Sequence, residues 1–228
     1  MNAVDDKTVV REYFNATGFD RWRRIYGTEE VNKVQLDIRK GHQQTVDRVL
    51  AWLQADGNLQ GLSICDAGCG VGSLSIPLGQ AGAMVYGSDI SEKMVAEAYQ
   101  RAKALFGPSN TISFAAQDLE SLSGRYHTVI CLDVLIHYPQ DKAGEMIGHL
   151  CSLAQERLIL SFAPKTVALS ALKKVGELFP GPSKTTRAYQ HREADIIAIL
   201  AKNGFAIARQ EMTSTRFYYS RLLEAIRR

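Results

Sequence analysis

From residue 62 onward, short apolar runs alternate with stretches of helical periodicity. Ser91 stands where it would cap one of these helices, which then ends at Gly107-Pro108. Regular alternation of strands and helices predicts an α/β fold, with parallel strands and helices on both faces of the sheet. The predicted strands are 62–68, 83–90, 111–118, 126–135 and 157–163, and the predicted helices are 73–82, 92–107 and 140–154.

Two later segments depart from this rhythm. Residues 164–191 contain three prolines and are longer than a simple crossover requires, which predicts a lid-like insert. Residues 204–228 read as two strands with a bend near Thr213, Ser214 and Thr215. Two strands joined by a short bend form a hairpin, so at least one strand must run antiparallel. The sequence therefore predicts a Rossmann-like sheet that is mostly parallel and ends in an antiparallel hairpin.

The first 61 residues contain no proline and read as helices. Three aromatic residues at i, i+3 and i+7 spacing lie among three arginines, Arg21, Arg23 and Arg24. A later stretch places Val46, Val49, Leu50 and Leu53 on one helical face. We therefore expect an N-terminal helical arm or cap at 1–61 and a core at 62–228. The aromatic residues are Phe19, Trp22 and Tyr26.

Composition excludes several classes of protein. The chain has 228 residues and a formal net charge of +3, with 46% apolar and 22% charged residues. This balance is ordinary for a globular protein and lacks the concentrated positive charge of a nucleic-acid binder, so we expect no nucleic-acid partner. No apolar run is long enough to span a bilayer.

The termini and cysteines bear on location. The stretch "MNAVDDKTVV" has neither an apolar signal core nor a transit segment. The cysteines at 65, 69, 131 and 151 show no CxxC spacing, which predicts reduced thiols in a cytoplasmic protein and no metal site.

The stretch "DAGCGVG", residues 66–72, follows the first predicted strand. A dinucleotide-binding turn would have its third glycine at position 73, where Ser73 stands. Such a loop lets backbone approach a ligand closely, and the next helix offers free N–H groups. The Asp66 carboxylate would repel a phosphate but suits a ligand with an amino group. These features disfavour a nicotinamide-dependent oxidoreductase.

Two further acids complete the pattern. Asp89 ends the second predicted strand, where a carboxylate can accept both ribose hydroxyls, and Asp118 follows the third, where it can accept from an adenine amino group. Ribose, adenine and an amino acid describe S-adenosylmethionine (SAM), with S-adenosylhomocysteine (SAH) as product. Taken singly, Gly72 also fits close helix–strand packing, and Asp118 also fits a cap of the next turn.

This combination resembles the class I methyltransferase pattern. The resemblance implies SAM as cofactor, bound at the carboxyl ends of the strands. The implied cofactor-binding residues are Asp66, Gly68, Cys69, Gly70, Gly72, Asp89, Ile90, Met94, Gln117, Asp118, Leu119 and Leu132.

Longer segments carry a more specific resemblance. The stretches "YFNATGFDRWRRIYG", "VNKVQLDIRKGH" and "PKTVALSALKKVGELFPGPSKTTRAYQHRE" resemble magnesium-protoporphyrin IX O-methyltransferases of chlorophyll biosynthesis, in photosynthetic organisms. The resemblance implies methyl transfer to a propionate carboxylate of magnesium protoporphyrin IX, giving the monomethyl ester, with magnesium present only as part of the substrate. It also implies contact with the porphyrin-binding subunit of magnesium chelatase, and a cyanobacterial origin or a mature form.

A flat, apolar, anionic tetrapyrrole suits a cap of aromatic and basic residues. The implied substrate-binding residues are Phe19, Trp22, Arg39, Tyr138 and Tyr189. Phe19 and Trp22 equally fit an amphipathic helix over the sheet edge, and at least one of the three head arginines is expected to face solvent. An apolar substrate and a basic, aromatic head favour peripheral contact with photosynthetic membranes.

The catalytic candidates are His137, after the fourth predicted strand, and Tyr26, in the cap. A propionate is already ionised at neutral pH, so the site needs to align it and exclude water rather than remove a proton. His137 could orient the carboxylate or ligate the substrate magnesium, and Tyr26 could orient the carboxylate or simply pack in the cap. Two other functions stay open here: a methyltransferase for a small phenol or quinone, and a non-catalytic tetrapyrrole carrier.

Overall fold

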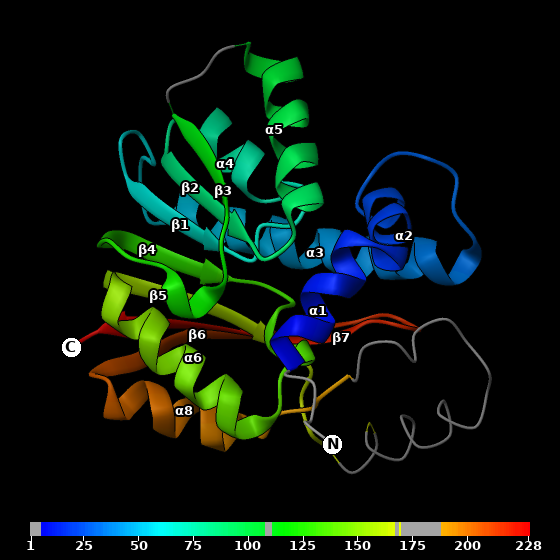
Figure 1. The fold of residues 1–228 in the computed structure, drawn as a ribbon. Helices are drawn as coiled ribbons and strands as arrows, with labels where there is room; N and C mark the ends of the chain where they lie inside the picture. Colours follow the sequence, from blue (N-terminus) through cyan, green and yellow to red (C-terminus); the bar gives the residue numbers. More distant parts are fainter. Residues whose placement is uncertain (1–5, 108–110, 167–168, 170–187) are drawn as a thin grey trace.

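The computed structural model describes residues 6–107, 111–166, 169 and 188–228. Its centre is one seven-stranded sheet in the order β3-β2-β1-β4-β5-β7-β6 (Figure 1). Strands β1 to β5 run parallel, and β7 pairs antiparallel with both β5 and β6. The strands are β1 (Ser63–Ala67), β2 (Met84–Asp89), β3 (Ile112–Ala116), β4 (Tyr126–Cys131), β5 (Ala154–Phe162), β6 (Phe205–Ser214) and β7 (Tyr219–Arg227). The mostly parallel sheet and its C-terminal hairpin are confirmed.

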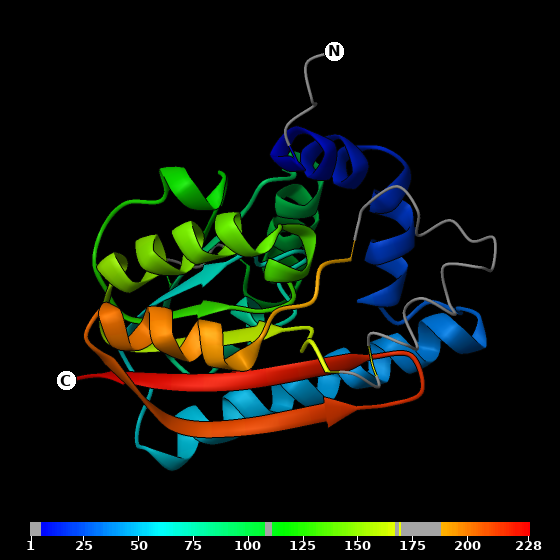
Figure 2. The same cartoon turned by 90° about the horizontal axis from the view of Figure 1, so that it is seen from below.

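Helices cover both faces of this sheet. Figure 2 shows α6 (Gln140–Leu153) and α8 (Glu193–Lys202) on one side of β6 and β7, and α3 (Lys33–Ala55) on the other. The core is accordingly divided between the two faces of the sheet, with α6 and α8 in one cluster and α3 and α4 (Ser75–Gln80) in the other. Helix α5 (Glu92–Phe106) packs against β2 and β3.

Local sequence signals explain where the helices begin and end. Ser91 accepts a hydrogen bond from the Met94 N–H and caps α5, as predicted, and α5 ends at Gly107, whose φ is +66°. Pro77 is the third residue of α4, inside the first turn, where its missing N–H is not needed. Asn32 and Gln35 form a reciprocal capping box at the start of α3.

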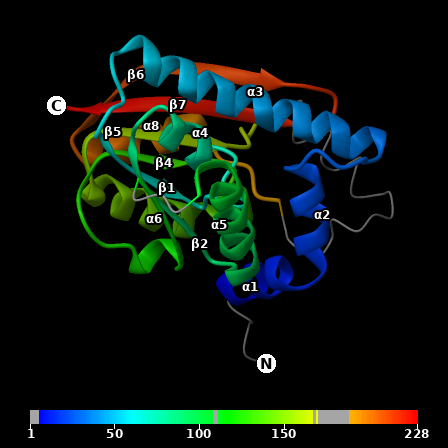
Figure 3. The same ribbon diagram turned by 90° about the horizontal axis from the view of Figure 1, so that it is seen from above.

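The N-terminal arm begins with α1 (Asp6–Asn15) and α2 (Thr17–Ile25), which lie beyond the carboxyl ends of the parallel strands (Figures 1 and 3). Arg101 of α5 donates to the backbone carbonyls of Tyr26 and Arg23, at 2.9 and 3.2 Å. Ser91 donates to Asn15 at 2.8 Å. These contacts hold α1 and α2 over α5, at the edge of the sheet where ligands bind in open α/β folds.

Two short 3-10 helices follow the strands at that same edge, η1 (Leu119–Ser121) after β3 and η2 (Leu135–His137) after β4. In the described part of the chain, no helix has the length and apolar character needed to cross a membrane. The predicted lid-like insert at 164–191 falls mainly on residues 167–168 and 170–187, which lie outside the described residues.

Candidate active site

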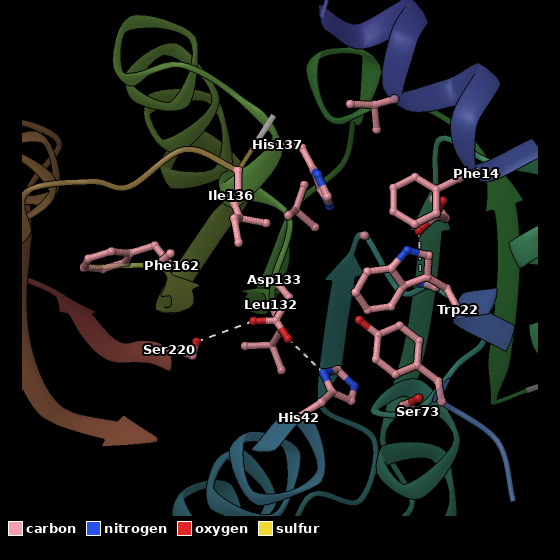
Figure 4. A pocket seen from close by; sticks show the side chains of 18 of the residues that line it. Phe14, Trp22, His42, Ser73, Leu132, Asp133, Ile136, His137, Phe162 and Ser220 are labelled. Atoms are coloured by element: carbon pink, nitrogen blue, oxygen red, sulfur yellow. Dashed lines mark hydrogen bonds and ion pairs between the residues drawn. The ribbon is translucent and has the colours of Figure 1, made fainter. Parts of the chain in front are cut away.

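A cavity lies at the carboxyl ends of the parallel strands, between the N-terminal arm and the sheet (Figure 4). In the described chain no lysine or arginine lines it, so the basic wall expected around an anionic substrate is missing from this part of the protein. The lining residues are Val10, Phe14, Trp22, Tyr26, Ile38, His42, Gly68, Cys69, Gly70, Ser73, Asp89, Ile90, Met94, Leu119, Leu132, Asp133, Val134, Ile136, His137, Tyr138, Phe162, Ala163, Ala188, Phe217, Tyr218, Tyr219 and Ser220.

The glycine loop after β1 forms one wall of this cavity. Gly68 and Gly70 have φ values of +89° and +52°, a region that side chains disfavour, and a Cβ on Gly68 would overlap Val134. Eight predicted cofactor-binding residues lie on the cavity wall: Gly68, Cys69, Gly70, Asp89, Ile90, Met94, Leu119 and Leu132.

Asp89 ends β2 beside the loop. One carboxylate oxygen accepts the Gly70 N–H at 3.0 Å and the other accepts the Ser91 N–H at 2.8 Å. Each oxygen therefore keeps capacity for a ligand hydroxyl, as a ribose diol requires. Burial raises the pKa of Asp89 to about 6, against these two hydrogen bonds, so donors from a ligand would stabilise the ionised form.

Asp66 does not reach the cavity wall. Its carboxylate lies buried under the glycine loop and accepts the Ser75 hydroxyl at 2.6 Å. Burial raises the pKa of Asp66 to about 6 against the Ser75 hydrogen bond, and the nearby Asp89 carboxylate adds to the rise. The expected contact of Asp66 with a ligand's amino group therefore stays a prediction, and the observed position of this side chain, off the cavity wall, does not support it.

Gly72, Gln117 and Asp118 also lie off the cavity wall. Asp118 caps η1 by accepting the Ser121 N–H at 3.0 Å and forms ion pairs with Lys7 and Arg11 of α1, at 3.2 and 3.5 Å. The contact with Ser121 fits the capping interpretation of Asp118, and the two ion pairs join α1 to the segment after β3. Gln117 accepts the Tyr86 hydroxyl at 2.8 Å, and a Cβ on Gly72 would lie 3.2 Å from Ile76, as close helix–strand packing predicts.

The arm contributes a run of aromatic side chains to the opposite wall. The ring of Trp22 lies 5.3 Å from that of Tyr26 and 6.3 Å from that of Phe14. Burial, reinforced by the charges of Asp133 and Asp89, raises the pKa of Tyr26 well above its usual value, so it stays a neutral hydroxyl. Trp22 and Tyr26 therefore line the cavity, and their roles toward a substrate stay predictions.

Other predicted substrate residues have structural contacts instead. Phe19 is absent from the wall and lies 5.7 Å under the Lys93 ammonium group. Arg39 donates to the backbone carbonyls of Ile25, Arg24 and Glu29, at 2.8, 2.6 and 2.7 Å, and so clamps the turn between α2 and α3. A guanidinium engaged by three carbonyls is poorly available to a propionate, and the structure does not place Arg39 in the cavity.

His137 and Tyr138 line the cavity after β4, as predicted. The Nδ1 atom of His137 is buried and has no hydrogen-bond partner among the described residues, and its ring lies 5.3 Å from that of Phe14. Burial lowers the pKa of His137 to about 4, and the Asp133 carboxylate opposes this only in part. Tyr189 is off the wall; its N–H donates to the Ile136 carbonyl at 2.7 Å.

The sequence reasoning missed a polar cluster at the floor of the cavity, made by His42, Asp133, Tyr218 and Ser220. Asp133 accepts from His42 at 2.9 Å (Figure 4). It also accepts from the Tyr218 hydroxyl at 2.9 Å. These residues come from α3, the segment after β4, the β6–β7 turn and the start of β7, far apart in sequence. The one local signal was an acidic residue near the end of a buried strand, similar to the signal that marked Asp89.

The glycine loop, the acid at the end of β2, and a sheet whose β7 runs antiparallel between β5 and β6 define the class. The protein is a class I methyltransferase, for which SAM is the methyl donor. A methyltransferase-domain model matches residues 64–156, and a model described as "Magnesium-protoporphyrin IX methyltransferase C-terminus" matches residues 131–227.

Relatives over the full length specify the family. The chain is 72% identical to a magnesium-protoporphyrin O-methyltransferase of Synechocystis sp., covering 99% of this chain and 98% of that protein. It is 60% identical to the chloroplastic magnesium protoporphyrin IX methyltransferase of Arabidopsis thaliana, covering 97% and 71%. The chain therefore belongs to the magnesium-protoporphyrin IX O-methyltransferase family, as the sequence resemblance implied.

A solved structure agrees with this assignment. The crystal structure of magnesium protoporphyrin IX methyltransferase from Synechocystis with bound SAH superposes with a TM-score of 0.91 at 70% identity, covering 97% of this chain and 100% of that one. A second structure of that enzyme contains SAM. An N-methyltransferase from Bradyrhizobium japonicum, at 14% identity and a TM-score of 0.61, shares the fold alone.

Proposed function

We propose that the protein transfers a methyl group from SAM to a propionate carboxylate of magnesium protoporphyrin IX, giving the monomethyl ester in chlorophyll biosynthesis. The names of relatives at 72% and 60% identity support the substrate. When bound, SAM supplies an electrophilic methyl group on a sulfonium. The observation that carries the proposal is that His137 lines a cavity shared with the glycine loop and the aromatic arm, while its buried Nδ1 has no hydrogen-bond partner among the described residues.

His137 would act by orientation rather than by removing a proton. A propionate is ionised at neutral pH, and a His137 whose pKa is about 4 is neutral there. A neutral imidazole donates one N–H, and that donor can hold the carboxylate in line for attack on the methyl group. We assign Tyr26 a second orienting hydroxyl, because it lines the cavity and stays protonated.

The aromatic arm would exclude water from this site. Phe14, Trp22 and Tyr26 form a wall of neighbouring rings against which a flat macrocycle would lie. Neutralisation of an anion and a cation as the bond forms is slowed by water, which stabilises the separate charges more than the transition state. Replacing water by aromatic surface therefore favours the reaction.

Peripheral membrane contact also belongs to this proposal. The exposed apolar side chains of Val34 and Leu36 lie at the start of α3, and that of Phe217 lies in the β6–β7 turn. Asp37 of α3 links the two segments by accepting the Phe217 N–H at 2.7 Å. Phe217 also lines the cavity. An apolar surface beside the cavity supports entry of a hydrophobic substrate from a membrane surface. Delivery by the porphyrin-binding subunit of magnesium chelatase stays a prediction.

The function is tested by incubating the protein with methyl-labelled SAM and a panel of acceptors. We expect label in magnesium protoporphyrin IX, and little in small phenols or quinones. Tight pigment binding without transfer would indicate a carrier and would contradict the proposal. Equal labelling of a small phenol would indicate a different acceptor class.

A further inference from the structure

His42 of α3 lines the cavity and has one ring nitrogen that no described residue engages. Its Nδ1 atom lies 2.9 Å from an Asp133 oxygen, and the two side chains are only 12% and 18% exposed. Its Nε2 atom is buried and has no hydrogen-bond partner among the residues that the structure describes. The Tyr26 ring packs against the imidazole, with ring centres 4.3 Å apart, which fixes the plane of the ring.

Asp133 is held in place by several protein donors besides the imidazole. Its carboxylate also accepts the Tyr218 hydroxyl at 2.9 Å, the Ser161 hydroxyl at 3.0 Å and the Ser220 hydroxyl at 3.4 Å. Its own N–H donates to Ser161 at 2.8 Å, and its φ of +57° lies in the left-handed region. With its carboxylate engaged by protein donors, Asp133 can act on a ligand only through His42.

The free nitrogen belongs to the cofactor end of the cavity. Figure 4 shows His42 and Ser73 at one end and His137 at the other. The electrostatic influence of His42 opposes the rise to about 6 that burial causes in the pKa of Asp66, so His42 lies near the glycine loop. The amino-acid end of SAM carries a carboxylate, and no lysine or arginine of the described chain lines the wall to receive it.

We propose that the His42–Asp133 pair anchors the carboxylate of the cofactor's amino-acid end. With the cofactor bound, both ring nitrogens donate, Nδ1 to Asp133 and Nε2 to the cofactor carboxylate. His42 is then a binding residue and Asp133 a positioning residue. This inference rests on SAM as the cofactor of the proposed function, and it separates the two cavity histidines: His42 serves the cofactor, and His137 the acceptor.

Binding by calorimetry tests the pair without turnover. The two ligands are SAH and decarboxylated SAH, which keeps the amino group and lacks only the carboxylate. The wild-type protein should prefer SAH by about tenfold to a hundredfold, as one charge-assisted hydrogen bond gives. In His42→Asn, the amide replaces Nδ1 and keeps the Asp133 contact but loses the outward donor, so the preference should fall to about threefold or less. His127→Gln, on β4 outside the cavity, is the matched control.

His42→Gln provides a second test, because its longer amide replaces Nε2 and should restore part of the preference for SAH. This variant also tests the proposal if thermal melting shows that His42→Asn does not fold. An unchanged preference for SAH in His42→Asn would overturn the inference, as would an equal loss for both ligands. Loss of magnesium protoporphyrin binding with SAH affinity intact would also overturn it, and would assign His42 to the substrate magnesium. Failure of the proposed acceptor chemistry would appear separately, as absent methyl transfer by a protein with normal SAH affinity.

Discussion

Replacing His137 by alanine should cost turnover and spare cofactor binding. The variant removes a buried ring whose Nδ1 has no partner among the described residues, so no structural hydrogen bond of that nitrogen is lost. A hydrogen bond to a charged group contributes about 1.5–3 kcal/mol, which corresponds to about a 10–150-fold loss. We expect kcat and kcat/KM for magnesium protoporphyrin to fall together, on the order of a hundredfold, with SAM affinity changed less than about threefold.

The pH profile gives the same prediction a second measurement. With a pKa of about 4, His137 stays neutral, so wild-type kcat should show no inflection near 6.5, where a general-base histidine would lose activity. The same pKa shift determines how stability depends on pH. In the unfolded chain the His137 imidazole takes up a proton near pH 6.5, so the contribution of His137 to the free energy of unfolding is complete above that pH and is lost as pH falls towards 4. The alanine variant should lack this loss, on the order of 1–3 kcal/mol. Near-normal turnover in the variant, or a wild-type inflection near 6.5 that the variant lacks, would refute the reasoning.

Three further predictions follow from the geometry. Asp89→Ala should weaken SAM binding by about 2–3 kcal/mol in calorimetry, since charge-assisted bonds to ribose are lost; an unchanged affinity would remove Asp89 from the site. Gly41→Ala should lower the free energy of unfolding by about 1–3 kcal/mol, because its Cβ would overlap the Tyr218 ring, 2.6 Å from Cγ. Gly148→Ala on α6, whose nearest atom would be 4.0 Å away, should be neutral or stabilising in the same urea titration, and equal effects would refute the packing argument. The protein should sediment with anionic vesicles at low salt and be released at high salt, and its complete absence from the low-salt pellet would count against membrane contact.

Much of the fold could be predicted because its signals are local. Apolar runs gave the strands, Ser91 and Gly107 gave the ends of α5, and the last 25 residues gave the hairpin. The division at residue 61 used the same kind of signal, but α3 buries Val46 and Val49 against the sheet, so this helix of the head packs with the core. A helical face shows that it will be buried and does not show which partner will cover it.

The site residues show the same difference between local signals and tertiary packing. Residues next to the glycine loop and strand ends, such as Gly68 and Asp89, could be predicted because the backbone itself places them. Arg39 lies off the cavity wall because turn carbonyls and a propionate attract the same guanidinium, and local sequence does not tell the two apart. The His42–Asp133 pair joins residues 91 positions apart, and only tertiary structure brings them together.

The central claim is that the methyl group ends on a propionate carboxylate. After incubation with methyl-labelled SAM and magnesium protoporphyrin IX, mild alkaline hydrolysis of the isolated pigment should release the label as methanol, because only an ester is cleaved in this way. The dimethyl ester of the same pigment has no free carboxylate and should accept no label. Label that survives hydrolysis, or equal labelling of the dimethyl ester, would contradict the account.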